Sequence, residues 1–140
     1  MHRVCLSHRR TAGFSLLELM VVVTIVAIVT AIAMPVYSNY VLRTKVKVAG
    51  ADLSALTAVV ENQRQRTLNY PDQAGVDQFS QWRASSDPSE FSFDYAPSDE
   101  GYVVSARWLQ DGKLSGCELT LDQSHEKSAS DTCMVNDQWR

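Results

Sequence analysis

The sequence predicts an α+β fold in which one long N-terminal helix packs against an antiparallel sheet of three or four strands. The chain has 140 residues, which is enough for one domain. No charged residue lies between Leu19 and Leu42, so an apolar helix precedes a more polar head. The second half contains short stretches of alternating apolar and polar residues separated by turn residues, a pattern typical of half-buried strands.

The first 13 residues form a basic segment that we predict is removed. Three arginines and no acid lie in it, and it has no apolar run. In a secretory signal peptide the apolar run precedes the cleavage site, whereas here it follows Gly13. Cleavage after Gly13 would therefore leave the apolar segment on the mature protein and create a new α-amine on Phe14. The alternative is a basic tail in front of an ordinary signal anchor.

Residues 14–41 are predicted to form a helix that is long enough to span a bilayer. The uncharged run Leu19–Leu42 covers 24 residues, about 36 Å at about 1.5 Å per residue. Pro35 lies inside this run, lacks a backbone N–H and clashes with the preceding turn. We therefore expect a kink at Pro35, or a locally melted turn near Ala31–Met34.

From residue 42 to about 67 the helix is expected to continue and to become amphipathic. Apolar residues recur at alternating steps of four and three, which places them on a single stripe. Gly50 is the weak point of this half. The stripe consists of Leu42, Val46, Ala49, Leu53, Leu56 and Val60, and the opposite face is expected to carry Lys45, Lys47, Asp52 and Glu61.

The head 42–140 continues with a polar connection over 68–90, which we expect Phe79 and Trp82 to anchor. The sheet is predicted over 91–122, because β-formers and period-two alternation recur there. The expected strands are 91–95, 102–109 and 117–122, with turns at 98–101 and at Asp111-Gly112. The tail 123–140 is polar and is expected to be irregular.

Two cysteines, Cys117 and Cys133, remain once the first 13 residues are removed together with Cys5. An even pair in a small exported head indicates a disulfide. It would close the loop 117–133, and a loop near that size contributes about 3 kcal/mol. Metal binding with His125 is the alternative, but neither cysteine belongs to a C-x-x-C pair and a fourth ligand is missing. We therefore predict no metal and no cofactor.

Glu18 is the only acid before Asp52, and it opens the apolar run. A carboxylate in this position is costly unless it is paired or lies at the membrane interface. The α-amine that cleavage would create on Phe14 is one helical turn away, so the two charges can pair within a chain or between neighbouring chains. An acid lying near lipid headgroups is the alternative.

Charge and residue content argue against two classes of function. Without its first 13 residues the chain has 10 basic and 16 acidic residues, a formal charge of −6, and no basic stripe that would indicate nucleic-acid binding. His125 lies in a polar turn without a nucleophile elbow or a glycine-rich loop, so we expect a surface histidine and no enzyme. Basic residues flank the apolar run equally, and the cysteine pair places the head outside the cytoplasm.

The residues that begin at Gly13, GFSLLELMVVV, are preceded by arginines and followed by Pro35, and they closely resemble the class III signal of type IV prepilins. The resemblance covers about residues 9–42. It implies that a membrane-bound prepilin peptidase cuts between Gly13 and Phe14 and then N-methylates Phe14. It also implies that Glu18 pairs with the N-terminus of a neighbouring subunit during assembly, and that the helix bends or melts near Pro35.

The C-terminal half bears a weaker resemblance to minor pilins of the PilE type. In those proteins a strand and turn of the pattern C-x-L-T-L-x-Q-x-G-x-[KR] precede a second cysteine and a late aromatic residue. Here Cys117-Glu-Leu-Thr-Leu-Asp-Gln123 is followed by Cys133 and Trp139. His125 stands where glycine is usual, so the geometry of this turn is expected to differ.

The resemblance implies the type IV pilin fold and a structural, non-enzymatic role as a minor pilin in pilus assembly, twitching motility and adhesion. Expected partners are other pilin subunits, major and minor, the prepilin peptidase/N-methyltransferase, the inner-membrane assembly platform and the inner membrane itself, but no nucleic acid. The precursor is expected to cross the bacterial inner membrane once, with a cytoplasmic N-terminus and a periplasmic head, before it enters a cell-surface pilus.

Three alternatives stay open. A major pilin shares every N-terminal feature. A pseudopilin of a type II secretion system does as well, although such heads often lack a C-terminal disulfide. A monotopic binding protein held by a signal anchor gives no reason for the Gly13-Phe14 junction or for Glu18.

Overall fold

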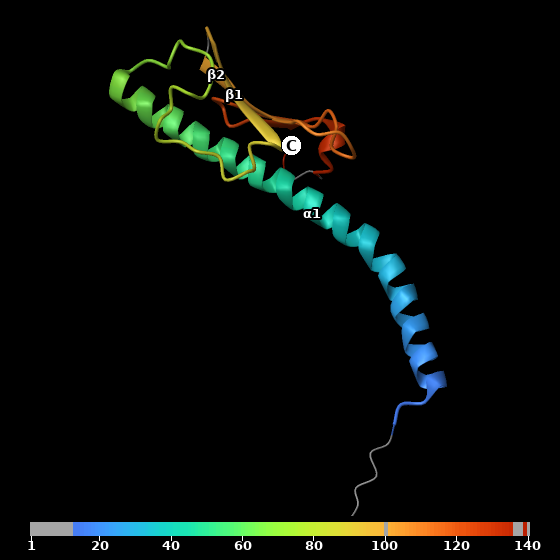
Figure 1. Cartoon of the computed structure of the whole chain (residues 1–140). Helices are drawn as coiled ribbons and strands as arrows, with labels where there is room; N and C mark the ends of the chain where they lie inside the picture. The colour runs from blue at the N-terminus through green and yellow to red at the C-terminus, as the bar shows by residue number, and fades with distance from the viewer. Residues whose placement is uncertain (1–12, 100, 136–138, 140) are drawn as a thin grey trace, which may run out of the picture. The chain divides into compact units, whose positions relative to one another are not determined.

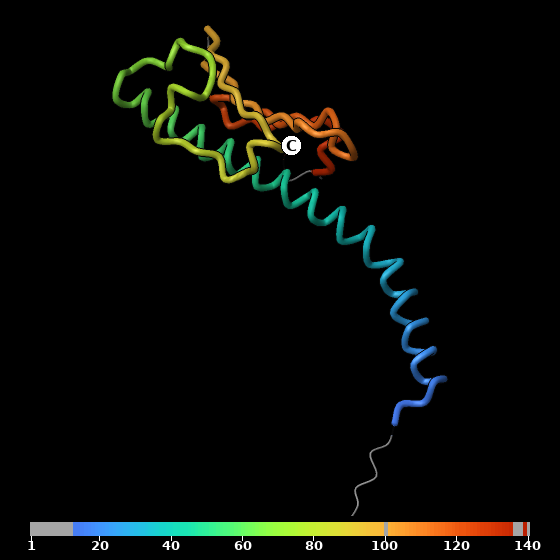
Figure 2. Tube along the Cα trace, viewed as in Figure 1, coloured from blue at the N-terminus to red at the C-terminus, as the bar shows by residue number. Residues whose placement is uncertain are grey.

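The computed structural model describes residues 13–99, 101–135 and 139. They fall into two compact units, one that ends at Ser38 and one that begins at Asn39. Helix α1, Leu16–Thr67, belongs to both units, and the sheet belongs to the second (Figures 1 and 2). The prediction that one helix continues from the apolar segment to about residue 67 is therefore confirmed.

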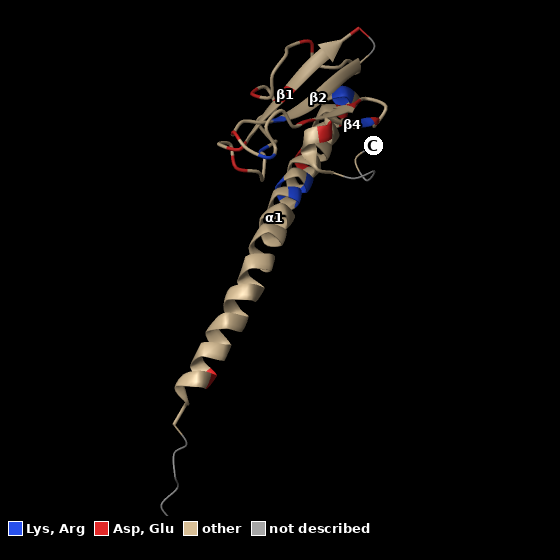
Figure 3. Cartoon of the chain, turned by 90° about the vertical axis from the view of Figure 1, so that its right-hand side faces the viewer, with Lys and Arg blue, Asp and Glu red and all other residues tan. Residues whose placement is uncertain are grey.

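Within the first unit α1 contains Pro35 and stays helical across residues 31–34. The melted turn that we expected as an alternative near Ala31–Met34 is thus absent from this single chain, and the kink at Pro35 stays a prediction. Figure 3 shows the long stretch of α1 that carries no charged side chain.

The second unit contains an antiparallel four-stranded sheet in the order β1-β2-β3-β4. Because each strand pairs with the next one in the sequence, the sheet is a simple meander in which short turns set the register. The pairs Tyr95↔Val104 and Val104↔Leu121 align the inward-facing side chains of three strands. The strands are β1 Phe91–Ser98, β2 Gly101–Trp108, β3 Glu118–Asp122 and β4 Lys127–Ala129.

Strand β4 corrects the expectation that the tail is irregular throughout. Its three residues pair with β3 in the register Thr120↔Ser128. The segment Lys-Ser-Ala has no apolar alternation, so its sequence does not identify it as a strand. Its pairing depends instead on the turn that precedes it and on the bonds that hold the tail to β3.

The core lies between the sheet and the stripe of α1, as predicted. Val46, Ala49, Leu53, Leu56 and Val60 are at most 1% exposed, and Leu42 packs against them in part. The inner face of the sheet supplies the opposing side chains. These include Phe91, Tyr95, Tyr102, Val104, Ala106, Trp108, Leu119 and Leu121.

The connection 68–90 covers a further face of the helix, which makes our placement of Asp52 wrong. We expected Asp52 on the exposed face, yet it is 5% exposed. Its carboxylate accepts hydrogen bonds from the backbone N–H of Ser85 and Ser86, both at 2.9 Å, and from the Ser86 hydroxyl at 2.6 Å. These three donors compensate for the loss of hydration that burial causes.

Two aromatic residues anchor the same connection, as expected. Phe79 is buried and packs edge-to-face on Tyr95 at 5.1 Å between ring centroids. The Trp82 ring packs on Phe93 at 5.2 Å, and its Nε1 donates to the Asp52 carbonyl at 3.2 Å. The connection is therefore attached to both the helix and the sheet.

Glu61 lies near the C-terminal end of α1 and accepts hydrogen bonds from two tyrosines. The Tyr70 hydroxyl donates to it at 3.0 Å and the Tyr102 hydroxyl at 3.2 Å. Burial, together with the negative charge and hydrogen bond of Glu61, raises the pKa of Tyr102 above its ordinary value. Burial likewise raises the pKa of Tyr95 to about 12. Both phenols therefore remain neutral donors at physiological pH.

Candidate processing and assembly site

The start of α1 is fixed by Ser15, which is its N-cap residue. The Ser15 Oγ accepts a hydrogen bond from the Glu18 N–H at 3.1 Å, and the Ser15 carbonyl accepts one from the Leu19 N–H at 3.2 Å. Ser15-x-x-Glu18 is the capping-box pattern, and a serine cap contributes about 1 kcal/mol to a helix. Our sequence reasoning missed this role, although S-x-x-E before an apolar run is its recognised signal.

The predicted cleavage junction lies outside the helix. Gly13 and Phe14 have non-helical backbone, and the Phe14 side chain is 75% exposed. A Cβ placed on Gly13 would have no described atom within 4 Å. The fold of the described chain therefore does not require glycine at this position, so a requirement for it would come from the enzyme that reads the junction.

Glu18 lies in the first turn of α1. The helix N-terminus carries partial positive charge, which stabilises an acid there. Cleavage after Gly13 would add the α-amine of Phe14 just before the N-cap. The Glu18 carboxylate and this amine would then both lie at the same helix end, but the pairing between them stays a prediction.

The apolar part of α1 is not covered by any of the residues that the structure describes. All side chains of residues 13–38 are exposed. The hydroxyls of Thr24, Thr30 and Ser38 bond internally, because they donate to carbonyls one turn earlier at 2.8, 2.7 and 3.0 Å. This arrangement leaves few polar groups to solvate, which suits a lipid or protein interior. Within the described residues, α1 is one helix that is long and apolar enough to cross a membrane.

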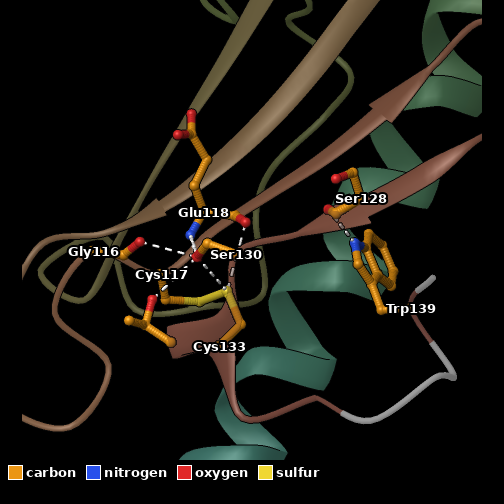
Figure 4. Close-up of a disulfide and its surroundings, with 8 residues drawn as sticks. Gly116, Cys117, Glu118, Ser128, Ser130, Cys133 and Trp139 are labelled. Atoms are coloured by element: carbon orange, nitrogen blue, oxygen red, sulfur yellow. Dashed lines mark hydrogen bonds between the residues drawn. A yellow bond between two sulfur atoms is a disulfide. The ribbon is translucent and has the colours of Figure 1, made fainter.

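The predicted disulfide between Cys117 and Cys133 is confirmed, with an S–S distance of 2.07 Å. Both cysteines are fully buried. Ser130 ties the same two segments together, since its Oγ accepts from the Glu118 N–H and donates to the Gly116 carbonyl, each at 3.0 Å (Figure 4). The tail is thus held to β3 by covalent and polar bonds.

Trp139 continues this attachment to the helix. Its Nε1 donates to the Ser128 carbonyl at 3.0 Å (Figure 4), and Lys127 lies over its ring at 5.0 Å. A Cβ on Gly50 would lie only 2.5 Å from the ring. Gly50 therefore makes room for the indole, which explains a glycine that otherwise weakens the helix.

The turn between β3 and β4 explains the usual glycine of the C-terminal pattern. His125 is exposed and has φ of 62°, in the left-handed region that favours glycine. The Asp122 side chain holds this turn, because one carboxylate oxygen accepts from the backbone N–H of Ser124 and of Glu126, both at 2.8 Å. Among the described residues, no cluster of three or more His, Cys, Asp or Glu could hold a metal ion.

Comparison with known proteins bears on the N-terminal motif first. A family model described as the prokaryotic N-terminal methylation motif matches residues 8–34. A fimbrial protein of Pseudomonas aeruginosa is 48% identical over 50 residues, which are 36% of this chain and 32% of that protein. The type IV major fimbrial protein FimA of Dichelobacter nodosus is 35% identical over 74 residues, which are 53% of this chain and 44% of that protein.

A fimbrial protein of Moraxella nonliquefaciens is 37% identical over 60 residues, which are 43% of this chain and 39% of that protein. The chain therefore spans less than half the length of each of these relatives. No solved structure matches it significantly. One long N-terminal helix, an antiparallel four-stranded sheet and a C-terminal disulfide constitute the type IV pilin fold. The methylation motif overlaps the start of α1, and the chain shares this motif, this fold and local similarity to fimbrial proteins with type IV pilins.

Proposed function

We propose that this chain is a structural subunit of a type IV pilus. The observation that carries the proposal is the apolar part of α1, residues 16–38, whose side chains are exposed and most of which lies within the methylation motif matched over residues 8–34. A helix that is apolar on all sides needs lipid or other helices around it. A pilus subunit meets both in turn, first in the inner membrane and then in the bundle of helices inside the filament.

Three parts of the chain would have separate roles. Residues 1–13 are a leader that prepilin peptidase removes on the cytoplasmic side. Residues 14–41 anchor the precursor in the inner membrane and later form the filament core. Residues 42–140 form the periplasmic head, which reaches the cell surface with the pilus. The partners are the peptidase, the assembly platform and other pilin subunits.

The N-terminal chemistry follows from the positions of three residues. Cleavage at the exposed, non-helical Gly13-Phe14 junction produces the α-amine of Phe14, which the same enzyme methylates. The Glu18 carboxylate of a neighbouring subunit then pairs with this amine, which offsets the cost of holding an acid among apolar helices. Pro35 provides the point at which the helix adapts during assembly.

We assign the chain to the minor pilins because its C-terminal pattern from Cys117 to Trp139 resembles theirs. The similarity to a type IV major fimbrial protein favours the second candidate, a major pilin. Abundance in sheared filaments separates the two roles. Deletion of the gene separates both roles from that of a pseudopilin. Surface pili, twitching and protein secretion are scored together in the deletion strain. Loss of secretion with pili intact would contradict the pilus role.

Intact-mass spectrometry of the chain from sheared surface filaments tests processing. We expect a mature chain that begins with N-methyl-Phe14. The variant Gly13→Leu should remain uncut, while the fold offers no obstacle to the larger side chain, so the effect reports on the peptidase. A filament-derived chain that still carries residues 1–13 would refute this step.

A second experiment addresses Glu18. Glu18→Ala should leave a membrane-inserted, disulfide-bonded protein that enters filaments several-fold less well, because the head contains none of the groups involved. Glu61→Gln is a control that changes an acid on the same helix within the head. Equal incorporation of Glu18→Ala and wild type would exclude the pairing role.

A further inference from the structure

Leu68 has two unfavourable features that no contact among the described residues of the head explains. It directly follows the last residue of α1, its N–H donates to the Arg64 carbonyl at 2.7 Å, and its φ is 61°. This left-handed position at a helix end is usually taken by glycine. The Leu68 side chain is also 84% exposed, the highest fraction among the large apolar side chains of the described residues. Backbone strain combined with an exposed apolar side chain points to a contact outside the chain.

A cleft of about 190 Å³ lies at the other end of the part of α1 that belongs to the head. Cavities of about 150 Å³ can admit benzene, so a four-carbon leucine side chain fits. Val48 and Phe91 provide apolar surface in it, and Val48 is 37% exposed. The lining consists of Thr44, Lys45, Val48, Ser85, Ser86, Asp87, Glu90 and Phe91.

The charges around Leu68 and the cleft are complementary. Arg66 is exposed two residues before Leu68. In the cleft, Lys45 forms an ion pair with Glu90, which leaves the exposed Asp87 as the remaining charge of the lining. A copy that placed its Leu68 in the cleft could therefore bring Arg66 toward Asp87, which would favour one orientation over others.

We propose that Leu68 of one copy of this chain inserts into the cleft of a second copy within the filament. This contact rests on the proposed function as a pilus subunit, in the second candidate role of a major pilin, because only then are copies of this chain neighbours in the filament. Leu68 lies 20 residues after Val48 on α1, about 30 Å along the helix, so one head cannot fill its own cleft. The two surfaces differ, and such a heterologous contact repeats in one direction without closing, as a filament requires.

A cysteine pair tests the contact in filaments. In Leu68→Cys/Val48→Cys the two new thiols are too far apart to join within one chain, so mild oxidation should produce a ladder of covalent oligomers from sheared filaments. The matched controls are the single variants Leu68→Cys and Val48→Cys, each of which lacks one partner of the contact and should form no ladder. A missing ladder from filaments in which this chain is abundant, or an equal ladder in either single variant, would overturn the proposal.

Leu68→Gly provides a second, independent readout. Glycine should raise the melting temperature of the full mature chain in detergent, because it relieves the left-handed backbone. The same variant should enter filaments several-fold less well, whereas Val103→Ala should enter normally. A more stable chain that assembles as well as wild type would contradict the proposal. Absence of even the wild-type chain from filaments would instead refute the pilus role.

Discussion

The two compact units share one helix, yet its apolar residues are exposed in the first unit and buried in the second. In the first unit every side chain from 14 to 38 is exposed, whereas in the second the stripe side chains from Val46 to Val60 are at most 1% exposed. The second unit covers its stripe with a sheet of its own, but the first has no such partner among the described residues. Apolar composition alone therefore does not define a core, and cover for the first unit has to come from lipid or from other chains.

The largest effect is expected when the second unit is produced without the first. A chain that starts at Leu42 should be a soluble monomer with the complete sheet, while the full mature chain should need detergent or filament partners. The negative formal charge of the head should also limit nonspecific association. Analytical ultracentrifugation with circular dichroism measures both properties. An unfolded or aggregated truncated head would show that the first half of the helix belongs to the domain core.

Paired truncations of single side chains sharpen the comparison within α1. Leu53→Ala should lower the free energy of unfolding of the head by about 2–5 kcal/mol, because it removes buried carbons and leaves a cavity. Val29→Ala, at a position 59% exposed, should leave that free energy unchanged. Denaturant unfolding followed by tryptophan fluorescence gives both values. Similar losses in the two variants would mean that Val29 contributes to the folding of the head.

The parts of the structure that the sequence predicts are those with a local periodic signal. The steps of four and three that contain Leu53, and the alternation of β1, correspond directly to burial. Asp52 has no such signal, since its burial depends on the connection 68–90 folding back over the helix. Strand β4 is too short and too polar to show a period. The contact of Trp139 with Gly50 joins residues far apart in the sequence, whereas the role of Ser15 was visible in its spacing and was overlooked.

The disulfide should make the next largest contribution to the free energy of unfolding of the second unit. Replacing Cys117 and Cys133 with serine should lower the free energy of unfolding by about 3 kcal/mol, because the loop that the bond closes becomes unrestricted in the unfolded chain. The remaining bonds of Ser130 should keep part of the tail attached. Denaturant unfolding of oxidised wild type and the double variant measures the change. No loss of stability would indicate that Ser130 and Trp139 suffice to hold the tail.

Replacing Asp52 is expected to lower the free energy of unfolding somewhat less than removing the disulfide. Asp52→Ala removes the acceptor of three hydrogen bonds and leaves two buried or half-buried backbone N–H groups without it, which should cost about 1–3 kcal/mol. Asp77→Ala, at an exposed position in the same connection, is the control and should change stability little. Limited proteolysis should also show faster cutting near residues 85 and 86 in Asp52→Ala. Unchanged cutting would mean that Phe79 and Trp82 alone hold the connection.

The smallest change in the free energy of unfolding is expected for a substitution at His125, and it is an increase. Its left-handed backbone carries a steric cost that glycine avoids, and the Asp122 hydrogen bonds that hold the turn come from backbone N–H groups. His125→Gly should therefore stabilise the head by about 0.5–1 kcal/mol, partly offset by the greater freedom of glycine in the unfolded chain. His125→Ala keeps the Cβ and should give no such gain, which makes it the matched control in thermal unfolding. If the alanine variant were stabilised as much as the glycine variant, the imidazole rather than the backbone would be the source of the cost. The glycine that is usual in related heads would then need an explanation other than the conformation of this turn.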